Sequence, residues 1–102
     1  MAIILEKYQS YESLANDPQT PVKVLRELST HHDSYVRFLV AGNPSTPSSV
    51  LVKLSNDQDW KVRYNVGENL NTPVEVVRKI YAGDIKKNIK EVVQDSYHEY
   101  KV

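Results

Sequence analysis

The sequence predicts an all-α fold: a short right-handed α-solenoid of about three helical repeats with a helical cap at each end. Two observations support this prediction. Thr-Pro pairs occur at 20–21, 46–47 and 72–73, a constant step of 26 residues. Within each unit, apolar residues fall three or four positions apart, the spacing of one helical face. A fixed period in this range is typical of stacked repeats, in which each unit buries its apolar face against the next.

The chain has 102 residues, which is the size of one domain. We divide it into an N-terminal cap over 1–13, three repeats over 14–39, 40–65 and 66–91, and a C-terminal cap or tail over 92–102. The second half of the third unit departs from the pattern, as terminal repeats often do because they cover the end of the core. We therefore expect a longer closing helix over roughly 84–98.

Each unit is expected to begin a helix at its Thr-Pro pair. The threonine stands at the N-cap, where its hydroxyl can accept a hydrogen bond from an amide of the first turn. The proline takes the first helical position, which needs no amide hydrogen. These structural positions are Thr20, Pro21, Thr46, Pro47, Thr72 and Pro73. The helices are expected to run to about residues 29, 55 and 81.

A second helical segment follows a polar break in the first two units. It begins at an aspartate that can cap it, Asp33 or Asp59, and carries two valines four residues apart. Arg37 and Arg63 stand four residues after these aspartates. The spacing predicts an ion pair within each helix or a ladder of charges between units. The alternative is that the arginines bind phosphate or carboxylate groups of a ligand.

These residues together resemble a known family. The pattern Asn-Pro-x-Thr-Pro-x-x-x-Leu-x-x-Leu, followed by Asp-x-x-Val-Arg, is similar to the leucine-rich repeat variant over about residues 13–81. The resemblance implies a HEAT-like solenoid of alternating α and short, partly 3₁₀, helices, with a binding or scaffolding role by analogy. The third unit has Leu70 where the pattern has proline. Some members carry a cysteine-rich cluster, which cannot apply here because the chain has no cysteine.

The composition argues against several chemistries. Without cysteine the chain has no disulfides and no thiolate metal sites. No nucleophile motif, phosphate-binding glycine loop or paired carboxylates stand out, so we expect no enzymatic activity and no cofactor. The apolar run near Met1 is too short for a signal peptide or a membrane span, and we expect a cytoplasmic protein.

The string His31-His32-Asp33 resembles a metal-binding cluster at first sight. A metal site needs three or four convergent ligands, and His98 is the only other histidine. We expect adjacent histidines to point in different directions. The string is therefore predicted to form a solvated turn, and no metal site is expected.

The predicted function is non-catalytic protein–protein interaction or scaffolding through an extended helical surface. Tyr35 and Trp60 lie near the starts of the second segments, where exposure is expected, and exposed aromatic residues are typical binding hot spots. Together with Arg26 and Arg78 they are the expected anchors of a protein partner. Partial packing of both residues over the turn is the open alternative. Phe38 and Tyr64 occupy the same position in successive units and are expected to pack between units.

The second hypothesis is a small nucleic-acid-associated protein. Its contact surface would be a basic strip on the first helices, made of Arg26, Lys53, Arg78 and Lys79. A solvated charged face is the simpler interpretation, because 13 basic residues balance 13 acidic ones and nucleic-acid binders usually carry a basic excess. We expect no membrane contact, and either a monomer or a homodimer formed through a poorly covered end of the stack.

Overall fold

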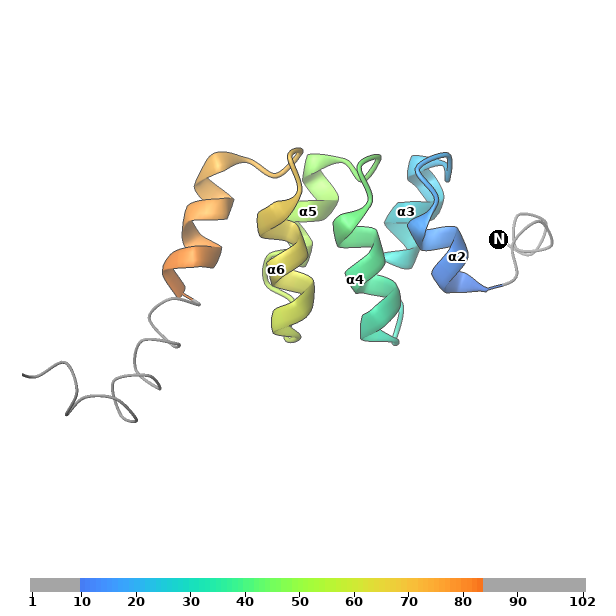
Figure 1. The fold of residues 1–102 in the computed structure, drawn as a ribbon, viewed down its shortest axis with the longest axis horizontal. Coiled ribbons are helices and arrows are strands. Elements are labelled where there is room, and N and C mark those ends of the chain that lie inside the picture. Colours follow the sequence, from blue (N-terminus) through green and yellow to red (C-terminus); the bar gives the residue numbers. More distant parts are fainter. Residues whose placement is uncertain (1–9, 84–102) are drawn as a thin grey trace, which may run out of the picture.

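The computed structural model describes residues 10–83, and all regular structure in this range is α-helical (Figure 1). The helices are α2 (Tyr11–Asn16), α3 (Val22–Leu28), α4 (Ser34–Gly42), α5 (Ser48–Leu54), α6 (Trp60–Glu68) and a further helix over 74–83, drawn in orange. No β-strand occurs between residues 10 and 83, so the all-α prediction is confirmed there. The expected closing helix over 84–98 and most of the expected N-terminal cap lie outside the described residues.

The helices α3 and α5 have the same length, and so do α4 and α6. The first residues of α3 and α5, Val22 and Ser48, are one Thr-Pro period apart, and so are their last residues, Leu28 and Leu54. The same holds for α4 and α6. The helix α2 ends at Asn16, one period before the end of α4. The sequence period therefore reappears in the positions of the helices.

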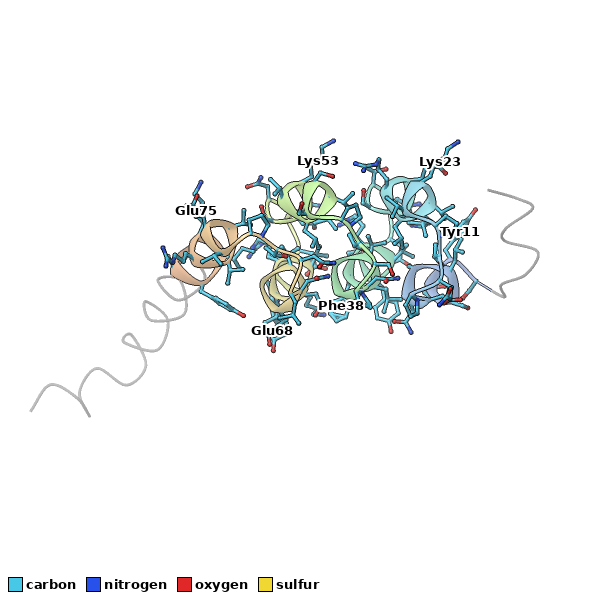
Figure 2. All side chains as sticks on the ribbon, turned by 90° about the horizontal axis from the view of Figure 1, so that it is seen from above. Tyr11, Lys23, Phe38, Lys53, Glu68 and Glu75 are labelled. Atoms are coloured by element: carbon cyan, nitrogen blue, oxygen red, sulfur yellow. The ribbon has the colours of Figure 1, made fainter. Side chains whose placement is uncertain are left out.

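The helices form two layers. Figures 1 and 2 show α3 and α5 side by side in one layer and α2, α4 and α6 in the other. The helix α4 packs against both α2 and α6, and α3 and α5 pack across the layers. In Figure 2 the labelled side chains of Phe38 and Glu68 point away from the layer that carries Lys23 and Lys53.

The core lies between these layers and is built from apolar side chains that recur once in each repeat period. The inner sides of α2, α4 and α6 contribute the buried set Leu14, Ala15, Val36, Val40, Ala41, Val62 and Val66. The inner sides of α3, α5 and the 74–83 helix contribute the buried set Val24, Leu25, Leu28, Val50, Leu51, Leu54 and Ile80. Full burial of one such side chain stabilises the fold by about 1.5–3 kcal/mol. Packing between layers therefore holds together helices too short to be stable alone.

The predicted N-cap role of the threonines is wrong. Pro21 and Pro47 occupy the N-caps in extended backbone, without side-chain cap bonds, and α3 and α5 begin one residue later. The threonines are buried and donate instead to a carbonyl six residues earlier, in the preceding helix. These hydrogen bonds run from Thr20 to Leu14 O (2.6 Å), from Thr46 to Val40 O (2.7 Å) and from Thr72 to Val66 O (2.7 Å). Each threonine thus satisfies a carbonyl near the C-terminal end of a helix.

The predicted aspartate caps of the second helices are confirmed. Asp33 accepts a hydrogen bond from the amide of Tyr35, and Asp59 accepts one from the amide of Lys61. Both helices then continue with α-helical hydrogen bonding to their last residues. The expectation of partly 3₁₀ helices is therefore wrong within residues 10–83. None of the helices described is both long enough and apolar enough to cross a membrane.

Candidate binding surfaces

Arg37 and Arg63 donate hydrogen bonds to the polar loops that precede their helices. The Nη1 atom of Arg37 donates to the carbonyls of His31 (2.7 Å) and His32 (3.1 Å). Arg63 makes the same contacts in the next unit, with the carbonyls of Asp57 (2.8 Å) and Gln58 (3.3 Å). These shared contacts give both arginines a structural role.

Arg37 also joins its own loop to the next one. Its guanidinium donates to both carboxylate oxygens of Asp57, at 2.8 Å and 3.2 Å. Of the two predicted arrangements, the contact between units is therefore formed, although its acceptor is Asp57 rather than Asp59. The side chains of Arg37 and Asp57 are 12% and 8% exposed. Burial raises the pKa of Asp57, but hydrogen bonds from Arg37 and the Asp59 amide outweigh it and lower the pKa overall.

Asparagine side chains form a second set of contacts between units, which the sequence analysis missed. The Nδ2 atom of Asn43 donates to the carbonyls of Ala15 and Asp17 in the preceding unit. Asn69 donates in the same way to the carbonyls of Ala41 and Asn43. Both asparagines also accept from the amide two residues later. The available signal was the recurrence of asparagine in successive units, each time before x-x-Thr-Pro.

The two adjacent histidines do not point in different directions as expected. Their rings stack with centroids 4.4 Å apart, and the ring of Tyr11 lies 5.0 Å from that of His31. His31 Nδ1 accepts a hydrogen bond from the Asp33 amide (3.0 Å). In the next unit Asp57 occupies the position of His31 and accepts the corresponding bond from the Asp59 amide. Over residues 10–83 no group of three or more His, Cys, Asp or Glu side chains could hold a metal ion.

Exposed aromatic side chains gather on α4 and α6. Tyr35 is 55% exposed and Trp60 is 58% exposed, both in the first turn of their helix. Tyr64 is 48% exposed, so the prediction that it packs between units like Phe38 is wrong. Phe38 is partly buried against the core and stacks on Tyr35 with ring centroids 5.9 Å apart. We call these four residues the aromatic surface.

The predicted basic strip belongs to the other helices. Arg26 lies on α3, Lys53 on α5, and Arg78 and Lys79 on the 74–83 helix, and all four are exposed. Arg26 donates to Ser49 of the neighbouring helix at 3.3 Å. The six predicted partner-binding residues therefore divide between two groups of helices and do not form one site.

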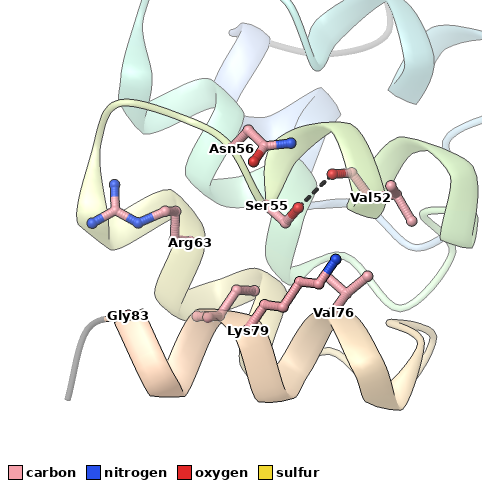
Figure 3. Close-up of a pocket in the computed structure, with 8 residues that line it drawn as sticks. Val52, Ser55, Asn56, Arg63, Val76, Lys79 and Gly83 are labelled. Atoms are coloured by element: carbon pink, nitrogen blue, oxygen red, sulfur yellow. Dashed lines mark hydrogen bonds between the residues drawn. The ribbon is translucent and has the colours of Figure 1, made fainter. Parts of the chain in front are cut away.

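A surface cleft of about 280 Å³ opens where α5, α6 and the 74–83 helix meet (Figure 3). Val76 and Lys79 approach it from the 74–83 helix, Val52 and Ser55 line it from α5, and Arg63 reaches it from α6. Within the cleft, Ser55 Oγ donates to the backbone carbonyl of Val52. Lys79 is thus the one residue of the predicted strip that lines this cleft.

The chain was compared with models of protein families, with curated proteins and with solved structures, and no match was found in any of the three.

Proposed function

We propose that this chain is a short α-solenoid of about three repeats, of the leucine-rich repeat variant type, and that it serves as a non-catalytic module for binding a protein partner. The solenoid part of the proposal is supported by the recurrence, from one unit to the next, of the helices and of the asparagine, threonine and arginine contacts. Regular stacking of this kind produces an extended surface that suits a binding role.

The observation that carries the binding role is the aromatic surface. Trp60 and Tyr64 are four residues apart on one stripe of α6, and Tyr35 and Phe38 are three residues apart on α4. About half of the surface of three of these side chains is in contact with water. Tryptophan and tyrosine are enriched among residues that dominate binding energy, because they bury a large area and lose little conformational entropy.

The second candidate is nucleic-acid binding, and a specific asymmetry of charge favours it. On α3, α5 and the 74–83 helix, five basic residues (Lys23, Arg26, Lys53, Arg78 and Lys79) stand against two acidic ones (Glu27 and Glu75). The whole chain has zero net charge, so this excess is local. Phosphate contacts of this kind would weaken steeply with salt, whereas an interface anchored by aromatic residues would not.

A pull-down from the protein's own cells separates the two candidates. The tagged chain would be compared with a Tyr35→Ala/Trp60→Ala variant and with an Arg78→Ala/Lys79→Ala variant, each with and without nuclease. We expect a stoichiometric protein that survives nuclease and is lost only from the aromatic variant. Loss of all bound material after nuclease, or loss only from the basic variant, would contradict the proposal in favour of nucleic-acid binding.

A further inference from the structure

The third unit departs from the sequence pattern at neighbouring positions on the protein surface. Tyr81 stands where the two preceding units have Ser29 and Ser55, and Gly67 stands where the second unit has the buried Ala41. Glu68 likewise corresponds to Gly42. Core positions such as Leu28, Leu54 and Ile80 stay apolar in all three units, whereas two of these positions acquire an aromatic ring and a charge.

These departures bring two tyrosines onto one carboxylate. Tyr81 donates a 2.5 Å hydrogen bond to Oε2 of Glu68, and the hydroxyl of Tyr64 lies 3.5 Å from Oε1 of the same side chain. We call Tyr64, Glu68 and Tyr81 the Tyr–Glu–Tyr cluster. Gly67 leaves room for the Tyr81 ring, because a Cβ atom at that position would make a tight contact of 3.3 Å with it.

The cluster has the chemistry of a site for a cation. The faces of tyrosine rings carry negative partial charge, and a carboxylate has about four acceptor positions, of which the two hydroxyls occupy no more than two. The hydrogen bond to Glu68 raises the pKa of Tyr81 to about 12, because only the neutral phenol can donate it. Glu68 is exposed, and within residues 10–83 no lysine or arginine forms an ion pair with it.

The cluster is continuous with the aromatic surface. Trp60, Tyr64 and Glu68 follow one another at intervals of four residues along α6, so they share one stripe of the helix. Figure 2 shows Glu68 on the same side of the molecule as Phe38. A partner segment lying along α6 would meet aromatic side chains first and the Tyr–Glu–Tyr cluster at the C-terminal end of the helix.

We propose that the Tyr–Glu–Tyr cluster binds an arginine side chain of the partner protein. The guanidinium stacks on the tyrosine rings and donates to the free acceptor positions of Glu68. Arginine fits better than lysine because its planar head can stack on a ring and donate to a carboxylate at the same time. This inference rests on the proposed function, since it assigns the partner of the same surface.

The test is a titration of the full ¹⁵N-labelled chain, followed by NMR, with the blocked peptide Gly-Gly-Arg-Gly-Gly. The same peptide with citrulline in place of arginine keeps the shape and removes the charge. We expect saturable shifts of the amides near Tyr64, Glu68 and Tyr81 with the arginine peptide and none with citrulline. Glu68→Gln is expected to weaken binding about tenfold, because a charge-assisted hydrogen bond is lost.

Glu27→Gln is the matched control, since Glu27 is an exposed glutamate on α3. It is expected to leave the affinity unchanged. Equal affinities of the two glutamine variants, or equal shifts with the citrulline peptide, would overturn the proposal. Such a result would leave the protein-binding role itself standing if the Tyr35→Ala/Trp60→Ala variant still lost the partner in the pull-down.

Discussion

Asn43 is the residue at which side-chain chemistry is most tightly specified. It is 2% exposed, and every hydrogen-bonding atom of its side chain has a partner. Its amide nitrogen donates to the Ala15 and Asp17 carbonyls, and its amide oxygen accepts from the Ser45 amide. Only an amide side chain of this length can donate and accept in the same place. A buried polar group contributes stability when it is satisfied in this way and costs stability when it is not.

The substitution Asn43→Asp should therefore be severely destabilising at neutral pH. It removes both donors and turns a carboxylate oxygen toward two backbone carbonyls. We expect a loss of about 3 kcal/mol in the free energy of unfolding, measured by urea denaturation. Asn56→Asp is the control, since Asn56 is exposed, and it should change stability by less than about 0.5 kcal/mol. Similar losses in the two variants would contradict the assigned role of Asn43.

Loops are joined to each other by the ion pair between Arg37 and Asp57, which lies between the polar segments that precede α4 and α6. The pKa of Asp57 is lower in the folded protein than in the unfolded chain. The folded protein therefore binds a proton at the Asp57 carboxylate less tightly than the unfolded chain does. The contribution to stability is therefore complete above the unfolded pKa, which is about 4. It is lost as the pH falls below that value.

We expect Asp57→Asn to lower the free energy of unfolding by about 1–2 kcal/mol at pH 7. At pH 3 the difference from the original chain should shrink, because the carboxylate of the original chain is then becoming protonated. Urea unfolding at the two pH values measures both differences. If the difference in the free energy of unfolding between the two chains were as large at pH 3 as at pH 7, the Asp57 side chain would stabilise the fold through its packing rather than its charge.

Helix packing between α4 and α6 depends on the absence of a side chain at Gly42. A Cβ atom there would lie 2.8 Å from Nδ2 of Asn65, which donates to the Phe38 carbonyl across the same contact. The helix itself would gain from alanine, which is favoured over glycine in helices by about 1 kcal/mol. Displacing the Asn65 amide would break its hydrogen bond to the Phe38 carbonyl, so the close contact is expected to outweigh this gain.

Gly42→Ala should therefore lower the melting temperature, whereas Gly83→Ala should not. A Cβ atom at Gly83 meets nothing within 4 Å among the described residues, so this second variant isolates the effect of helix propensity. We expect a net loss of about 1 kcal/mol for the first variant and no loss for the second. Calorimetry on both would decide, and stabilisation by Gly42→Ala would refute the proposed contact.

Local features of these elements could be predicted from the sequence, and contacts between elements could not. Asp33 and Asp59 were correctly predicted as caps because each accepts from an amide two residues away. The role of Thr46 was predicted wrongly because its acceptor, the Val40 carbonyl, becomes available only when the preceding helix folds back. Likewise Asp57 lies far along the chain from Arg37, in the next unit, and no local spacing indicates that pairing.

For the whole molecule, the decisive feature is that its two groups of helices carry different side chains. Tyr35 and Trp60 were expected to be exposed, and they are. Arg26 and Arg78 were expected to anchor the same partner, but they lie on other helices. The helical period places residues on a face and does not say which helices share a layer. The structure separates the aromatic surface from the basic strip, so that each can be tested by itself.

The most direct measurement is an amide chemical-shift map of the ¹⁵N-labelled chain bound to the protein recovered in the pull-down. We expect the perturbed amides to cluster in α4, α6 and around Tyr81, and the affinity to change little with added salt. Perturbations confined to α3 and α5, with affinity falling steeply as salt rises, would contradict it and assign binding to the basic strip.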